Sequence, residues 1–443
     1  MEVIQFIHET TWNDLPQNVR HQARRCLLDT LGAGISGRAT DLSRIVHDFA
    51  ASAFGGNGAR LWLDGREVSP PGAALANGMT IDSLDVHDGH PLTKGHAGAA
   101  VVPGLFASIS SERAVGLSGE EFLTTLVIGY EIALRAGLAL HDTACDYHTS
   151  GAWNALGVAA LAARRYGLDS GQTRHALGIA EYHGPRSQMM RCIDHPTMLK
   201  DGSGWGAMAG ISAALLAQTQ FTGAPALTVE SDEVKAIWQD LGGRWQITHQ
   251  YFKPHAVCRW AQPAIEAALK LQQNHPITPG TVKHVLVSTF HEAVRLNCRF
   301  PQSTEEAQYS LPFPLAAALV HGRLGVAELT GTALRDPVVL QLCERVELKE
   351  DNKFSQQFPD KRLARVEIET KDGSLIDSGE FEADWEASSP PSDSDLRDKF
   401  QRLANEQLPG ERAAELEQIV WHCEKLPDLD KLLTLITLPT TKD

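Results

Sequence analysis

Apolar residues recur at helical spacing through most of the first 275 positions of the chain. Over 16–35, Val19, Leu27 and Leu31 share one stripe behind Pro16, which predicts a helix that starts at the proline. Similar runs, with capping signals at Ser118 and Asp169 and a terminating Gly167, predict helices at 42–54, 118–140, 152–166, 170–180, 202–217 and 262–272, and one that starts at Pro70. This part of the chain is therefore predicted to be all-helical.

Two of these predicted helices, 152–166 and 202–217, consist almost wholly of glycine, alanine and other small or apolar residues. Helices with so little side-chain bulk can pack with their backbones close together, as at the centre of a bundle. Each follows a polar loop, and the segments 85–98 and 253–259 are two more polar loops that precede predicted helices. We therefore expect these four loops to lie close together in space.

The pattern changes after Asn274, where period-two alternation largely replaces helical spacing. Strands are predicted at 282–290, 345–348, 363–370 and 374–381, and helices at 311–320 and 336–342. The tripeptide Lys371-Asp372-Gly373 joins the last two strands as a hairpin. After the linker at 388–392, helices are predicted at 393–405, 411–424 and 428–436. This region is thus predicted to be an α+β unit followed by three helices.

Charge and composition narrow the class of partner. Forty basic and fifty-five acidic side chains give a net charge of −15, which argues against a nucleic acid or an anionic membrane as a partner. No apolar run reaches about 18 residues, so no membrane span is predicted. The seven cysteines are scattered without CxxC spacing, and no secretory signal opens the chain. A cytoplasmic protein with reduced thiols is expected.

The loop that spans 85–98 carries the densest group of chemically active side chains. It contains three histidines, His87, His90 and His96, together with Lys94 and two aspartates. Its glycines and its proline prevent a regular helix, while both of its flanks are apolar. A polar loop between two buried helices presents side chains from a rigid scaffold. We therefore interpret this loop as the centre of a functional site.

Basic side chains recur in all four polar loops: His90, Lys94, His96, His148, Arg186, Lys200, Lys253 and Arg259. Any one of them could be a helix cap, a surface charge or a core histidine, and only the clustering favours a site. Together they predict a positively charged pocket that suits a substrate with two or three carboxylates. Removing a proton beside a carboxylate needs a base, which histidine can supply, and a cation that stabilises the developing negative charge.

Signatures of other chemistries are missing from the sequence. No GxGxxG follows a strand, and neither GxxxxGK[ST] nor GxSxG is present, which argues against dinucleotide, nucleotide and α/β-hydrolase sites. The three loop histidines are natural candidates for metal ligands. They lack HExxH or helical HxxxH spacing, however, so we predict proton transfer and no bound metal.

At these residues the chain resembles the MmgE/PrpD family, which includes 2-methylcitrate dehydratase, cis-aconitate decarboxylase and iminodisuccinate epimerase. The resemblance covers nearly the whole chain. The segments that carry it are Asn77-Gly78, Leu84 to His90, Gly95-His96-Ala97-Gly98, Val101-Val102-Pro103, Tyr130-Glu131, His148 to Gly151, Ala176 to Ala180, Lys200-Asp201-Gly202, Lys253-Pro254, Cys258-Arg259, Pro263-Ala264 and Glu306 to Pro312.

The resemblance implies a mainly helical fold with a large helical domain and a smaller α+β lid. On this basis we expect a helical domain at 1–275, a lid at 276–388, and C-terminal helices at 389–443 that return to the helical domain. The family also implies an active site between the two domains, a homodimer and no organic cofactor. Position by position, it implies catalytic roles for Asp85, His96, His148 and Lys200, and substrate binding is expected from His90, Lys94, Arg186, Lys253 and Arg259.

Two departures from the family pattern leave the reaction open. The dehydratase and decarboxylase loops usually read DDTWHP, where this chain has Asp88-Gly89-His90-Pro91, and Phe313 replaces a frequent tyrosine. We predict a lyase that removes an α-proton from a small di- or tricarboxylate, with a hydro-lyase favoured. An epimerase or isomerase, or a decarboxylase, is the alternative. A non-catalytic carboxylate-binding protein is the alternative of another class.

Overall fold

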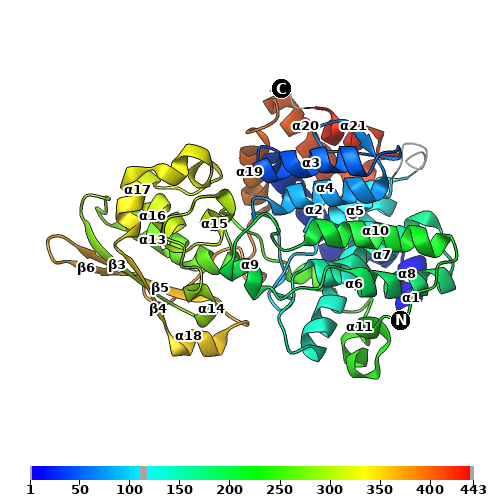
Figure 1. The fold of residues 1–443 in the computed structure, drawn as a ribbon, viewed down its shortest axis with the longest axis horizontal. Coiled ribbons are helices and arrows are strands. Elements are labelled where there is room, and N and C mark those ends of the chain that lie inside the picture. Colours follow the sequence, from blue (N-terminus) through cyan, green and yellow to red (C-terminus); the bar gives the residue numbers. More distant parts are fainter. Residues whose placement is uncertain (1, 110–116, 440–443) are drawn as a thin grey trace.

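The computed structural model describes residues 2–109 and 117–439. Two parts lie side by side, a large helical body and a smaller part built on a mixed sheet (Figure 1). Helix α9 and loops of the helical body lie where the two parts meet. The chain is therefore mainly helical with a small mixed sheet, as predicted.

The first half of the chain builds the helical body. Its helices are α1 (Val3–Glu9), α2 (Gln17–Gly37), α3 (Asp41–Ala53), α4 (Pro70–Asp82), α5 (Gly98–Ala107), α6 (Gly119–Thr143), α7 (Gly151–Tyr166), α8 (Ser170–His183), α9 (Met190–Asp194), α10 (Ser203–Gln218), α11 (Leu227–Glu230) and α12 (Lys235–Trp238). The short strands β1 (Ala59–Arg60) and β2 (Glu67–Val68) pair antiparallel beside them.

The capping signals in the sequence mark real helix ends. The Ser118 side chain accepts a hydrogen bond from the backbone N–H of Glu121, 3.3 Å away, at the start of α6. Asp169 and Gln172 form a reciprocal capping box at the start of α8. Gly167 ends α7 with a left-handed φ of 68°, which glycine adopts without strain.

The small residues of α7 and α10 let the backbones of these helices approach closely. A Cβ on Gly210 would lie 2.6 Å from the carbonyl oxygen of Ala155, so no larger residue fits there. The helices α4, α6 and α8 pack around this pair. As a result the N-termini of α7 and α10 meet, and the N–H of Gly151 donates to the carbonyl of Asp201 at 3.1 Å.

Helix α6 is long and apolar enough to cross a membrane by length and composition, which the sequence analysis did not anticipate. In the fold, 94% of its apolar window is buried inside the helical body. Its apolarity is therefore explained by its position in the core, where α7 covers one of its sides.

The smaller part, which we call the lid, is built on a mixed sheet with the order β4-β3-β5-β6, and β7 also pairs with β5. Strands β3 and β4 run parallel, whereas β5 is antiparallel to β3. Its elements are β3 (Val282–Thr289), α14 (His291–Val294), α15 (Thr304–Gln308), α16 (Pro312–His321), α17 (Pro337–Cys343), β4 (Val346–Glu350), α18 (Asn352–Gln357), β5 (Leu363–Thr370), β6 (Leu375–Asp377) and β7 (Phe381–Glu382). The strand predicted at 374–381 is thus two strands, because Gly379 turns the chain with a φ of 65°.

Helix α13 (Gln262–Asn274) packs against α16 and β5 of the lid rather than within the helical body. Its Glu266 carboxylate accepts a hydrogen bond from the backbone N–H of Asp384 at 2.7 Å, and Gln272 donates to the carbonyl of Leu319 at 2.7 Å. The boundary predicted at residue 275 therefore lies too late, because the apolar stripe of α13 covers the lid's sheet.

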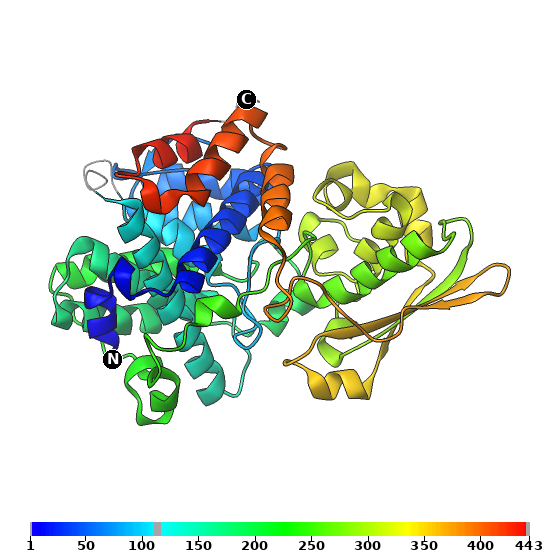
Figure 2. The same cartoon turned by 180° about the vertical axis from the view of Figure 1, so that it is seen from behind.

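The three closing helices, α19 (Asp393–Ala404), α20 (Gly410–Trp421) and α21 (Asp430–Thr437), lie against the first helices of the chain (Figure 2). Helix α19 packs along α2. There the buried ammonium of Lys399 donates to the carboxylate of Asp29 and to the carbonyl of Val86, each at 2.6 Å. The C-terminal segment thereby helps to hold the loop that follows α4.

Candidate active site

The loop between α4 and α5, predicted as the centre of the site, is folded back on itself. Backbone bridges join Gly89 to Tyr251 and His90 to Gly95. Asp85 and Lys94 have left-handed φ values of 50° and 52°. Such backbone conformations cost about 1–3 kcal/mol each for residues other than glycine, and they persist only where the surroundings enforce them.

Glycine is required where this loop meets its neighbours. A Cβ on Gly89 would lie 2.5 Å from the hydroxyl of Tyr251 and 2.8 Å from Nδ1 of His96. A Cβ on Gly98 would collide with the hydroxyl of Tyr130 and the carboxylate of Asp88. The glycines therefore let the loop close tightly around the His96 imidazole.

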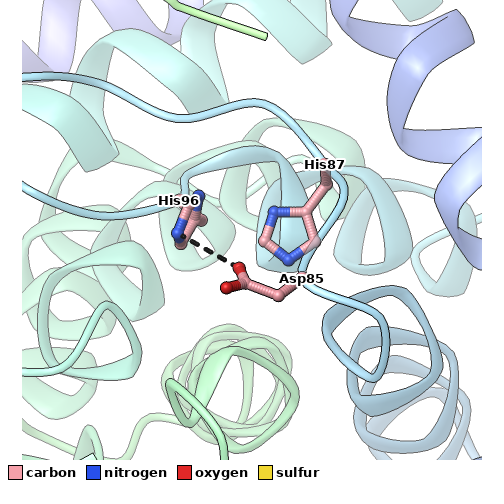
Figure 3. Close-up of side chains that lie close together, drawn as sticks. All are labelled: Asp85, His87 and His96. Atoms are coloured by element: carbon pink, nitrogen blue, oxygen red, sulfur yellow. Dashed lines mark ion pairs between the residues drawn. The ribbon is translucent and has the colours of Figure 1, made fainter. Parts of the chain in front are cut away.

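Asp85, Lys253 and His96 form the polar centre of the site. The Lys253 ammonium donates to the Asp85 carboxylate at 2.5 Å and to the Asp85 carbonyl at 2.7 Å. His96 Nε2 lies 3.8 Å from the same carboxylate. Figure 3 marks this pair with a dashed line. All three side chains are buried.

One contact and two pKa shifts define the protonation states of His96 and Asp85. His96 Nδ1 lies 2.6 Å from the carbonyl of Asp88, which can only accept, so Nδ1 carries the proton and Nε2 is free to accept one. Burial and the Lys253 ammonium hold the pKa of His96 well below its usual value. Burial alone would raise the pKa of Asp85, but the ammonium groups of Lys253 and Lys200 outweigh it and keep that pKa below its usual range. The site thus pairs an ionised carboxylate with a neutral imidazole.

Lys200 also has a left-handed φ, of 52°, and lies just before α10. Its buried ammonium donates to the side-chain carbonyl of Gln308 and lies 4.8 Å from the ring centre of Tyr309. Burial and the nearby Asp85 carboxylate raise the pKa of Tyr309 well above its usual value, so this phenol keeps its proton. Lys200 therefore supports a lid tyrosine at the site.

A chain of polar groups fixes the backbone of His96. Its N–H donates to the hydroxyl of Ser150 at 2.9 Å, and that hydroxyl donates to the carboxylate of Asp201. Asp201 in turn receives support from Asp82, whose carboxylate accepts from the Asp201 N–H at 3.3 Å. The meeting of α7 and α10 thus positions the imidazole.

His87 is not among the residues predicted to be catalytic or substrate-binding, yet it lies against the site. Its ring is edge-on to that of His96 with centroids 4.5 Å apart. Its Nε2 contacts the Asp82 carboxylate at 3.2 Å. Because both rings are buried, a change at His87 acts directly on the position of His96.

The site opens onto a small cavity of about 20 Å³ between the helical body and the lid. That is room for about one water molecule. Four of the predicted residues line it, namely Asp85, Lys94, His96 and Arg259. The other lining residues are Tyr147, Met189, Ile193, Tyr251, Cys258, Trp260, Tyr309 and Arg362. A polycarboxylate fits only when the lid and the body separate.

His148 and Arg186 lie elsewhere, at a larger cavity of about 470 Å³ in the helical body. Arg186 Nε donates to His148 Nε2 at 3.2 Å, and the His148 Nδ1 contacts the carbonyl of Asp146 at 2.7 Å. Burial and Arg186 lower the pKa of His148. The neighbouring Tyr147 lines the small cavity instead, so these two consecutive side chains face different cavities.

His90 and Arg259 differ in what they can contribute. His90 is buried beside His249, and burial with that second imidazole lowers its pKa to about 3, so it stays neutral. It lies outside the lining of both cavities. Arg259 lines the small cavity, but its guanidinium is paired with Glu386 at 2.6 Å. Neither offers an unpaired positive charge to a substrate.

Asp85, His87 and His96 could together offer three ligand atoms to a metal ion, all within 4.8 Å of one another. The Lys253 ammonium, however, lies 2.5 Å from the carboxylate of that set. A divalent cation there would have to displace it or bear its repulsion. The donor set therefore fits proton transfer better than metal binding, and the absence of a metal stays a prediction.

The chain is similar to known proteins along nearly its whole length. The model of the MmgE/PrpD N-terminal domain matches residues 2–238, and that of the MmgE/PrpD C-terminal domain matches residues 255–425. The human cis-aconitate decarboxylase is 28% identical over 459 aligned positions, covering 98% of this chain and 93% of the relative. That of Aspergillus terreus is 24% identical and covers 99% and 96%. The mitochondrial 2-methylcitrate dehydratase of Yarrowia lipolytica is 25% identical and covers 80% and 74%.

Proposed function

Given that this chain belongs to the MmgE/PrpD family, we propose that it is a lyase that needs no cofactor and moves a proton at a carbon beside a carboxylate of a small polycarboxylate. The observation that carries the proposal is the protonation state of His96. Its Nδ1 is held by the Asp88 carbonyl, and its Nε2, at the cavity, is free to accept a proton. A neutral imidazole kept so close to an ammonium is suited to act as a base at neutral pH.

Each residue then has a distinct role. His96 Nε2 accepts the proton, and Asp85 stabilises the imidazolium that forms, because its carboxylate stays ionised 3.8 Å away. Lys253 keeps Asp85 ionised and His96 neutral before the proton moves. Tyr309, which lines the cavity and keeps its own proton, is the candidate acid on the lid side.

Two reactions follow from the same groups. In a decarboxylation, the C–C bond to one carboxylate breaks, carbon dioxide leaves, and the electron pair ends in a C–H bond. The proton for that bond is one that His96 Nε2 has accepted from solvent and that Asp85 stabilises there. In a dehydration, the base removes a C–H proton while the C–O bond breaks, and an acid protonates the leaving hydroxyl. We place decarboxylation first, since relatives matching nearly the whole chain bear that name. Dehydration, favoured from the sequence alone, is the second candidate.

Incubation of the purified protein with cis-aconitate and with 2-methylcitrate in deuterated water tests the proposal. Proton NMR would show loss of carbon dioxide, loss of water, or deuterium at carbon without net reaction, which would indicate an epimerase. We expect turnover of one of the two acids, and its loss in His96→Asn. If neither acid reacts or exchanges, while both still bind, the protein is a carboxylate-binding protein and the proposal is wrong.

A further inference from the structure

Arg362 precedes strand β5 of the lid and lines the small cavity. Its side chain is buried, with the residue only 2% exposed. Among residues 2–109 and 117–439, no carboxylate forms an ion pair with it. Burial and Glu386 raise the pKa of Glu382 on the neighbouring strand, and Arg362 only partly opposes this rise without forming an ion pair. A buried guanidinium without an anionic partner is rare, because removing that charge from water is costly.

The hydrogen bonds of Arg362 leave part of its fork unused. Its Nη1 donates to the carbonyl of Pro359 at 3.1 Å, and its Nη2 donates to the carbonyl of Pro91 at 2.8 Å. Its Nε is buried and has no partner in the described part of the chain. The guanidinium also lies 5.9 Å from the ring centre of Tyr251, which lines the same cavity.

Lys94 is a second cation at this cavity without an ion-pair partner among the described residues. Its ammonium lies 4.6 Å from the ring centre of Tyr147. It lines the same small cavity as Arg362, and burial and the positive charge of Arg362 lower its pKa. The other lining arginine, Arg259, is neutralised by Glu386, so Arg362 and Lys94 carry the uncompensated charge.

We propose that Arg362 and Lys94 form a carboxylate subsite that binds one carboxylate of the polycarboxylate substrate away from the reacting carbon. The inference rests on the proposed function and extends it to this lid residue. A guanidinium fork with an unused N–H fits a carboxylate, and a neighbouring ammonium adds charge. Arg362 also donates to the Pro91 carbonyl of the helical body, so the subsite lies where the lid meets that body.

Binding of an inert tricarboxylate, propane-1,2,3-tricarboxylate, tests the subsite without relying on turnover. Isothermal titration calorimetry would compare it with a dicarboxylate, succinate, in wild type, Arg362→Met and the control Arg365→Met. Arg365 lies on β5, three positions after Arg362, is partly exposed, and pairs with Asp377 at 2.5 Å, so its loss removes one lid charge outside the cavity. We expect Arg362→Met to weaken tricarboxylate binding about tenfold to a hundredfold, and succinate binding less than about threefold. Arg365→Met should bind both as wild type does.

A purely structural role predicts a different result. If Arg362 only holds the lid on the loop, its loss weakens both ligands by the same factor, and the subsite is refuted. Equal binding of the tricarboxylate by wild type and Arg362→Met refutes it too, as does a wild-type protein that binds neither acid. Arg362→Lys keeps the charge and serves if the methionine variant does not fold; it should lose tricarboxylate affinity selectively but less. If the wild type has lyase activity but Arg362→Met binds the tricarboxylate as the wild type does, the proposed function holds and the subsite is refuted. If Arg362→Met loses tricarboxylate binding selectively but the wild type turns over neither acid, the subsite holds and the proposed function is refuted.

Discussion

The buried pair between Asp85 and Lys253 allows the sharpest prediction. Its atoms are 2.5 Å apart, the Lys253 side chain is fully buried, and that of Asp85 is 4% exposed. Lys253→Met would leave a buried carboxylate without its partner, which typically costs about 3–5 kcal/mol. The Asp85 backbone would also lose a hydrogen bond that holds its left-handed conformation. We therefore expect Lys253→Met to lower the free energy of unfolding by about 3–5 kcal/mol at pH 7.

The double variant Asp85→Asn/Lys253→Met distinguishes the stability lost by breaking the ion pair from the stability lost by replacing either residue. With both charges removed, we expect most of the lost stability to return, because replacing a whole buried pair is often nearly neutral. Urea unfolding at pH 7, followed by circular dichroism, measures all four members of the cycle. Neutral pH is appropriate because the pKa of Asp85 is depressed in the folded state. Its contribution to the free energy of unfolding is therefore present at pH 7 and lost only in acid. Additive losses in the double variant would refute the coupling.

Three other outcomes are expected. Burial and Asp29 raise the pKa of Asp88 from 3.8 to about 7, so ionisation of Asp88 should lower the free energy of unfolding as pH rises from about 4 to 7. Asp88→Asn should abolish this slope in unfolding measurements and gain up to about 4 kcal/mol at pH 8. An unchanged slope would contradict the assignment. Lys200→Ala should reduce kcat/KM by a factor equivalent to about 1.5–3 kcal/mol without unfolding the protein, and near-normal kinetics would remove Lys200 from the site. Dialysis against a strong chelator should leave activity intact, and a loss restored by one divalent metal would overturn the proton-transfer role of the histidines.

Local signals predicted most helices because they act within one or two turns. The caps at Ser118 and Asp169 and the stop at Gly167 involve neighbours in sequence. The alternation of buried and exposed residues in β5 is likewise visible in the chain. The place of α13 was not, because its apolar stripe fits a core in either domain and only tertiary packing decides which.

The candidate site was predicted in part for a similar reason. The cluster of polar residues on a glycine-rich loop identifies Asp85 and His96. The structure brings them together with Lys253, which lies 168 positions after Asp85 in the chain. Arg362 lies outside the four polar loops, just before a strand with ordinary alternation, so no local pattern marks it. His148 and Arg186 share their loops' polarity with the site, yet the backbone turns them toward another cavity.

The central claim is that His96 moves the proton. Deuterium incorporation at the carbon beside the carboxylate, followed by NMR on an acid that the wild-type protein turns over, tests it most directly. The variants to compare are His96→Asn, His148→Asn and, as a control, His291→Asn, which changes an exposed lid histidine paired with Glu350. The account predicts that exchange falls by about 10²–10⁴ in His96→Asn and stays at the wild-type rate in His291→Asn. Exchange that persists in His96→Asn but disappears in His148→Asn would place the base at the larger cavity and contradict the account.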